Sequence, residues 1–228
     1  KNGTRLLRSL HFDHYRVDLH LYEKNWQATA GQASLESSDL GYPMELALFF
    51  DDNFHIQVRA FTKWLEQVKT SVASVLLFHK SYPSTPDELS GEVIPLLKAA
   101  FPDVKAVTGT NANFAQINRS IPGETGNDSV CFSIHPQEHA SDNATLVENL
   151  KAQEYAVKSA RRFGDRKGIL ISPVTIQRRF NANNTLVELP WQGSGLPPQA
   201  DSRTMSLFGG CWTAGSLKYL CESGAESV

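Results

Sequence analysis

The chain has 228 residues, enough for one large domain or two small ones. Its hydrophobic share of 41% and charged share of 20% are ordinary for a globular protein, and its net charge of -2 argues against the broadly basic surface that nucleic-acid binding needs. No apolar run reaches membrane-spanning length, and the first residues lack the apolar core of a signal peptide. The three cysteines, Cys131, Cys211 and Cys221, form neither a CxxC motif nor a disulfide framework. These features predict a cytoplasmic protein with no membrane contact and no nucleic-acid partner.

Strands and helices alternate along the predicted structure. The expected strands are residues 15–21, 44–50, 72–79, 105–111, 129–135 and 168–175. The expected helices are the helix end at residues 3–11 and residues 22–38, 54–70, 88–101, 113–119, 144–163 and 205–221. A long loop is expected at residues 180–203, and residues 225–228 have the pattern of the start of a seventh strand.

Two of the strands carry polar side chains on one face and apolar side chains on the other. In the first strand, Arg16, Asp18 and His20 alternate with apolar residues. In the fifth, residues 129–135, the apolar side chains also alternate with small and polar ones, and the strand ends in His135 before Pro136. A strand buried on both faces of a doubly wound sheet would instead be apolar throughout.

The alternation of strands and helices predicts a parallel sheet of the α/β class with right-handed crossovers. There is no GxGxxG sequence after the first strand, so a nucleotide-binding Rossmann domain has no support. The polar strand faces favour a (β/α)8 TIM barrel, formed as a single domain over residues 1–228. We expect this barrel to be truncated at both ends, because the sequence begins abruptly and stops within an apolar pattern.

In a TIM barrel the active site lies at the carboxyl ends of the strands, so polar residues there are the first candidates for a site. They are Asp18, His20, His79, Asn111, His135, Gln137, His139 and Ser172. Each one alone is more often a structural residue. Several strands that end in such groups together predict a polar pocket. Arg16 and Glu45 lie nearer the strand starts, and we expect them to form an internal ion pair.

Several longer motifs resemble the TIM-barrel part of the D-apionate lactonase family. They are residues 16–21 (RVDLHL), 109–119 (GTNANFAQINR), 133–150 (SIHPQEHASDNATLVENL), 171–175 (ISPVT), 179–181 (RFN) and 206–220 (SLFGGCWTAGSLKYL). Together they extend over most of the chain. The sequence departs from the family at Gln116, where an acidic residue is expected. Family members are longer, with β-rich segments that flank the barrel.

The resemblance implies a hydrolase that opens D-apionolactone in the breakdown of apiose. We expect the enzyme to use no metal and no other cofactor. Such a reaction needs a general base to activate water and donors to hold the developing oxyanion. We expect His135 or His20 to be the base and Asp18 to orient a histidine. We expect His79, Asn111, Gln137, His139 and Ser172 to hold the sugar hydroxyls or the oxyanion. The oligomeric state does not follow from the sequence.

Three alternatives stay open at this point. A glycoside hydrolase needs two carboxylates, and the nearest candidate acid is Glu138 in the loop after Pro136. A zinc hydrolase would use Asp18, His20, His135 and His139 as ligands. A carbohydrate-binding barrel without catalysis is the third, although the aromatic residues do not cluster in a platform-like run.

Overall fold

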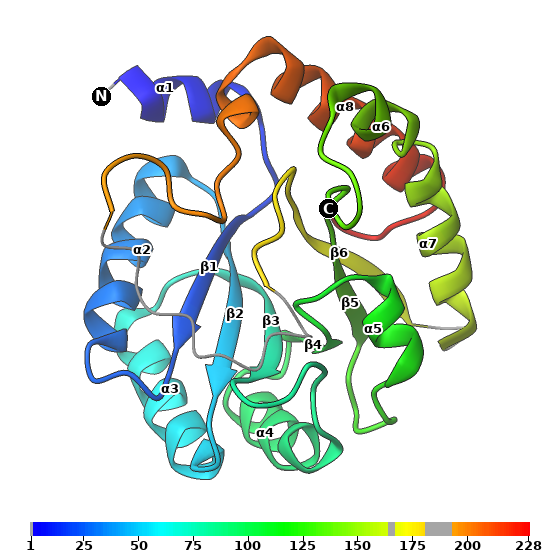
Figure 1. Cartoon of the computed structure of the whole chain (residues 1–228). Coiled ribbons are helices and arrows are strands. Elements are labelled where there is room, and N and C mark those ends of the chain that lie inside the picture. Colours follow the sequence, from blue (N-terminus) through cyan, green and yellow to red (C-terminus); the bar gives the residue numbers. More distant parts are fainter. Residues whose placement is uncertain (1, 164–166, 181–192) are drawn as a thin grey trace. The chain divides into compact units, whose positions relative to one another are not determined.

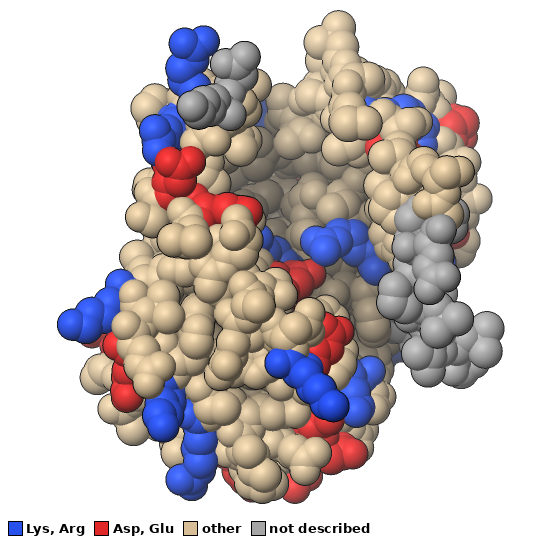
Figure 2. All heavy atoms as spheres, turned by 90° about the vertical axis from the view of Figure 1, so that its left-hand side faces the viewer, with Lys and Arg blue, Asp and Glu red and all other residues tan. Residues whose placement is uncertain are grey.

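A computed structural model describes residues 2–163, 167–180 and 193–228 (Figure 1). The chain divides into two compact units. Unit 1 comprises residues 1–109 and 122–129, and unit 2 comprises residues 110–121 and 130–228. None of the helices in the described ranges combines the length and the apolar character that a membrane crossing would need. On the face shown in Figure 2, acidic and basic side chains are interspersed.

Unit 1 contains four strands that alternate with helices. In chain order its elements are α1 Asn2–Ser9, β1 Tyr15–His20, α2 Trp26–Leu40, β2 Met44–Phe50, α3 Phe54–Val68, β3 Val72–His79, α4 Asp87–Ala100 and β4 Lys105–Gly109. The strands lie in the order β1-β2-β3-β4, and each neighbouring pair is parallel. The predicted elements are confirmed here, and β2 and β3 have the predicted limits. The second helix begins at Trp26, four residues later than predicted, because residues 21–25 form turns.

The core of unit 1 lies between one face of this sheet and the helices. Val17 and Leu19 of β1 join the alternate residues of β2 and β3 in one buried cluster with side chains of α2, α3 and α4. Trp26 of α2 packs edge-on against Trp64 of α3, with ring centroids 5.9 Å apart. The alternation of β1 therefore turns Arg16, Asp18 and His20 away from the helices, as predicted.

Unit 2 holds the later strands and helices. Its elements are α5 Phe114–Arg119, β5 Ser129–Ile134, α6 Asn143–Glu148, α7 Ala152–Ala160, η1 Arg161–Phe163, β6 Gly168–Val174, η2 Ser202–Met205 and α8 Leu207–Glu222, the first residue of β5 being assigned to unit 1. Val130, Phe132 and Ile134 of β5 pack with β6 and the helices in one cluster, which confirms the predicted apolar face. The predicted start of a seventh strand is also confirmed, because Ser227 pairs in parallel with Leu170 of β6.

The predicted helix over residues 144–163 is wrong in one respect, because it is broken between Glu148 and Ala152. In a continuous helix the carbonyl of Leu146 would accept the N–H of Leu150. Here it accepts the indole N–H of Trp212 at 3.2 Å, and the N–H of Leu150 donates to Val147 at 3.1 Å. A hydrogen bond from α8 therefore replaces one helical bond. The predicted loop at residues 180–203 lies partly outside the described residues, and its described end is irregular up to η2.

Candidate functional site

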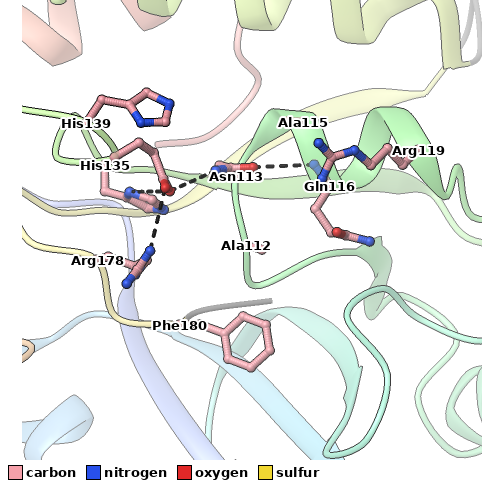
Figure 3. A pocket seen from close by; sticks show the side chains of 10 residues that line it. Ala112, Asn113, Ala115, Gln116, Arg119, His135, His139, Arg178 and Phe180 are labelled. Atoms are coloured by element: carbon pink, nitrogen blue, oxygen red, sulfur yellow. Dashed lines mark hydrogen bonds and ion pairs between the residues drawn. The ribbon is translucent and has the colours of Figure 1, made fainter. Parts of the chain in front are cut away.

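Unit 2 contains a polar pocket of about 280 Å³ (Figure 3). Its lining residues are Ala112, Asn113, Ala115, Gln116, Arg119, His135, Glu138, His139, Arg178 and Phe180. His135 follows directly after β5, and Arg178 follows β6. The pocket therefore lies at the carboxyl ends of these two strands, which is the catalytic end of a TIM barrel.

Local sequence explains how His135 and Asn113 come to line this pocket. His135 continues the alternation of β5, so its side chain lies on the face opposite to Phe132 and Ile134. Asn113 caps helix α5, and its Oδ1 accepts the N–H of Gln116 at 3.3 Å. The cap leaves the amide Nδ2 of Asn113 available as a donor to the pocket.

Glu138 connects the polar groups of the pocket. Its Oε1 accepts a hydrogen bond from Nδ2 of Asn113 at 2.9 Å and lies 3.4 Å from Nδ1 of His135. Its Oε2 lies 3.5 Å from Nη1 of Arg178. Figure 3 shows these three contacts converging on one carboxylate. The side chain of Glu138 is 33% exposed, so solvent weakens the two charged contacts.

The imidazole of His135 is the most buried ionisable group of the pocket. Its side chain is 3% exposed, and Nδ1 makes no hydrogen bond with the described residues, although it faces Glu138. Burial lowers the pKa of His135 below its usual value; the negative charge of Glu138 opposes this shift, and the positive charge of Arg178 adds to it. His135 is therefore neutral at pH 7, which is the state a general base needs.

The other candidates in unit 2 have different surroundings. His139 lines the pocket, as predicted, and is exposed. Asn111 is half-buried and Ser172 is buried, but neither belongs to the described lining. Gln137 does not belong to the described lining either. Its amide nitrogen donates to the carbonyl of Ile176 at 3.1 Å and to Oδ2 of Asp201 at 2.7 Å, which uses both of its N–H groups.

The candidates of unit 1 are held by their own neighbours. Asp18 accepts a hydrogen bond from Nε of Arg16 at 2.9 Å. Nδ1 of His20 lies 2.7 Å from the hydroxyl of Tyr22, and its ring stacks on Phe49 with centroids 4.6 Å apart. The role of Asp18 in orienting a histidine stays a prediction. Arg16 and Glu45 lie opposite each other in the β1-β2 register, where the predicted ion pair would form.

The prediction that His79 shares a face with Asp18 and His20 is wrong. His79 lies opposite Phe50 in the β2-β3 register, and Phe50 belongs to the helix-facing cluster. Its Nε2 lies 3.4 Å from Asp52, and its Nδ1 accepts the N–H of Ser81 at 3.1 Å. The alternation continues for one residue beyond Phe78, so the last side chain of β3 turns toward the helices. His79 therefore lies on the helix side of the sheet, and a role for it in substrate binding stays a prediction.

Apart from two alanines, the lining residues that the sequence did not predict are Asn113, Arg119, Arg178 and Phe180. Asn113 had a usable signal, because an asparagine directly before a helix caps it and lies next to a strand end. Arg178 and Phe180 follow β6 by a few residues, where a barrel places its functional loops. Among the described residues, no group of three or more His, Cys, Asp or Glu side chains is arranged to hold a metal ion.

Comparison with known families identifies the barrel. The family model described as D-apionate lactonase, TIM barrel domain, matches residues 2–228. The chain belongs to this family. A D-apionate lactonase from Brucella anthropi is 32% identical over 91 residues, a match that covers 40% of this chain and 15% of that protein's length. The chain therefore corresponds to a small part of that curated relative.

The fold of this family member agrees with a solved structure. A beta-glycosidase from Pyrococcus horikoshii superimposes with a TM-score of 0.56, covering 99% of this chain and 72% of that chain. The two sequences are 9% identical, so the similarity concerns the fold alone. The chain thus has the α/β architecture of part of a TIM barrel, as predicted.

Proposed function

We propose that the protein hydrolyses a small sugar lactone, with D-apionolactone as the substrate and D-apionate as the product. The observation that carries this proposal is a buried, neutral histidine that faces a carboxylate at the carboxyl end of a barrel strand. Membership in the D-apionate lactonase family supports the choice of substrate. The pocket volume of about 280 Å³ suits a single small sugar, since ligand sites start at roughly 300 Å³.

In the proposed reaction, His135 is the general base. It takes a proton from water through Nε2, while Nδ1 faces Glu138. The hydroxide oxygen bonds to the lactone carbonyl carbon, and the carbonyl oxygen becomes an oxyanion. As the carbonyl re-forms, the bond between this carbon and the ring oxygen breaks, and protonated His135 returns the proton to the departing oxygen. The products are a hydroxyl group and a carboxylic acid, which ionises in water.

Glu138 acts in this scheme as the positioning residue of His135. A carboxylate beside Nδ1 favours the tautomer that leaves Nε2 free of hydrogen, and it stabilises the imidazolium that forms during the reaction. Asn113 and Arg178 hold the carboxylate in place from its two oxygens. In this arrangement Glu138 has the task that was predicted for Asp18.

The pocket favours lactone hydrolysis over glycoside hydrolysis. A glycosidase uses a pair of carboxylates on the two sides of the scissile bond. Among the described residues, Glu138 is the only carboxylate that lines the pocket. The similarity to a beta-glycosidase concerns the fold and supplies no second carboxylate.

The test is to incubate the protein with D-apionolactone, other aldonolactones and aryl glycosides. Acid release is measured as the protons taken up by a weak buffer, and aglycone release is measured by absorbance. We expect acid release from D-apionolactone above the spontaneous rate and no aglycone release. Aglycone release without acid release would overturn the proposal in favour of a glycosidase. Binding of the sugars without any turnover would overturn it in favour of a carbohydrate-binding barrel.

A further inference from the structure

The charges that line the pocket of unit 2 do not balance. The lining contains two guanidinium groups, those of Arg119 and Arg178, and one carboxylate, that of Glu138. Glu138 lies 3.5 Å from Arg178, and these two charges offset each other. His135 and His139 add no formal charge while they are neutral. The described lining therefore carries one positive charge in excess, on Arg119.

Arg119 is placed to use this charge in the pocket. It is the last residue of helix α5, and an arginine there also interacts favourably with the helix dipole. In Figure 3, however, its guanidinium extends back toward Asn113 at the start of the helix, on the side of α5 that lines the pocket. Glu138, the one described carboxylate of the lining, is the partner of Arg178, so Arg119 has no carboxylate partner in the described lining.

We propose that Arg119 forms a carboxylate subsite in this pocket, which binds the ring-opened aldonate in preference to a neutral sugar of the same skeleton. The inference deepens the proposed function, because lactone hydrolysis converts a neutral ester into a carboxylate. A guanidinium fits the two oxygens of a carboxylate with a pair of parallel hydrogen bonds. The side-chain amide of Gln116, which lines the same wall, supplies a neutral donor beside it.

The residue at position 116 fits the subsite, because Gln116 lines the pocket with a neutral amide. A glutamate beside Arg119 on the same helix would add a second negative charge to the lining and would compete for the guanidinium. Glutamine keeps the size of the side chain and removes that charge. The described lining of this chain is thereby suited to an anion.

The experiment measures binding directly by isothermal titration calorimetry, without turnover. The probes are two matched pairs, D-apionate with its alditol apiitol and D-gluconate with sorbitol, in which a carboxylate replaces a primary alcohol. We expect at least one aldonate to bind roughly tenfold more tightly than its alditol, a modest factor because Arg119 is exposed. The preference should decrease as salt is added.

Three variants show whether Arg119 is the cause. Arg119→Gln should reduce the preference to about onefold, and Arg119→Lys should retain part of it because the charge remains but the fork is lost. Arg59→Gln removes an exposed arginine from α3 in unit 1 and should leave the preference unchanged. Equal or absent binding within both pairs, or an unchanged preference in Arg119→Gln, would overturn the inference.

The binding data, taken together with the lactonase assay, separate this inference from the proposed function. Turnover of D-apionolactone without any aldonate preference would retain the lactonase and reject the subsite. An aldonate preference that depends on Arg119, in a protein that opens no lactone, would retain the subsite and reject the lactonase.

Discussion

Unit 1 and unit 2 each carry a histidine at the carboxyl end of a strand, but the two side chains have different partners. His20 is stacked on Phe49 and contacts the hydroxyl of Tyr22, whose pKa is raised by burial and by nearby acidic groups, so the phenol is neutral. His135 faces the charged carboxylate of Glu138. A charged partner can stabilise an imidazolium during a reaction, whereas a neutral phenol mainly fixes the ring.

The pockets of the two units also differ in the end of the strands at which each one lies. In unit 1, a pocket of about 340 Å³ is lined by the ends of α2 and α3 and by the loops that lead into β2 and β3. It therefore lies at the amino-terminal ends of the strands, where barrels keep residues that serve stability. The pocket of His135 lies at the carboxyl ends. A histidine at a strand end is thus a candidate base when a charged carboxylate and an open pocket lie beside it.

The largest expected effect comes from His135→Ala. Removal of the general base should lower kcat/KM for D-apionolactone by roughly 10² to 10⁴, measured as the initial rate of acid release. His55→Ala, which removes an exposed histidine from α3, should keep wild-type turnover. If His20→Ala loses as much activity as His135→Ala, the assignment of the base to His135 is contradicted, because the base would then be in unit 1.

The next effect concerns the pH dependence. Only the neutral form of His135 can accept a proton, so kcat/KM should rise with pH and reach half its maximum below pH 6.5, because burial lowers the pKa of this histidine. Glu138→Gln should lower kcat/KM by about tenfold and move this limb to lower pH, because the lost negative charge had raised the pKa of His135.

Arg178→Gln should move the same limb in the opposite direction, because the positive charge of Arg178 lowers the pKa of His135. Shifts of the same sign in the two variants, or no shift in either, would contradict the electrostatic account. The measurement is a pH–rate profile of kcat/KM for wild type and both variants at one ionic strength.

A smaller effect is expected on the stability of unit 2. Trp212→Phe removes the indole N–H that satisfies the buried carbonyl of Leu146, and it should reduce the free energy of unfolding by about 1–3 kcal/mol. Trp26→Phe is the matched ring replacement in unit 1. Urea unfolding followed by circular dichroism gives both values. If Trp212→Phe reduces the free energy of unfolding no more than Trp26→Phe does, this hydrogen bond does not have the proposed stabilising role.

The smallest effect is expected at Asp128 in unit 1, which binds Lys98 at 2.7 Å and the N–H of Ala106 at 2.8 Å. Its side chain is 39% exposed, so Asp128→Asn should cost only about 0.5–1 kcal/mol. The salt bridge to Lys98 and the backbone hydrogen bond hold the pKa of Asp128 below its usual value against the opposing effect of burial. The stabilisation is therefore present above the unfolded pKa of about 3.9 and is lost as the pH falls through the folded pKa. The difference between wild type and variant should disappear at low pH.

Periodicity predicted most of the fold because strand alternation is a local property. The faces of β1 and β5 follow from single residues such as Val17 and Phe132, and the structure confirms both. The break after Glu148 was not predicted, and the hydrogen bond that replaces a helical one there comes from Trp212, more than sixty residues away in the chain. Local sequence carries no record of such a partner.

The site was predicted in part for the same reason. His135 and His139 line the pocket, and both follow from the position of β5 in a barrel. His79 was misplaced, because one more step of alternation turns it toward the helices. Gln137 lies outside the described lining, where its amide contacts Asp201 far along the chain. Arg119 belongs to helix α5, and the sequence pattern of this helix does not predict that one of its sides lines a pocket.

Each unit contains tryptophan side chains that can serve as an optical label. The indoles of Trp26 and Trp64 lie in unit 1, and Trp212 is buried in unit 2 with its N–H donated to a carbonyl. In a Trp191→Phe background, fluorescence from the remaining tryptophans would report the two units through separate chromophores. The order in which the two units lose structure in denaturant would then be visible in the emission spectrum, without an added probe.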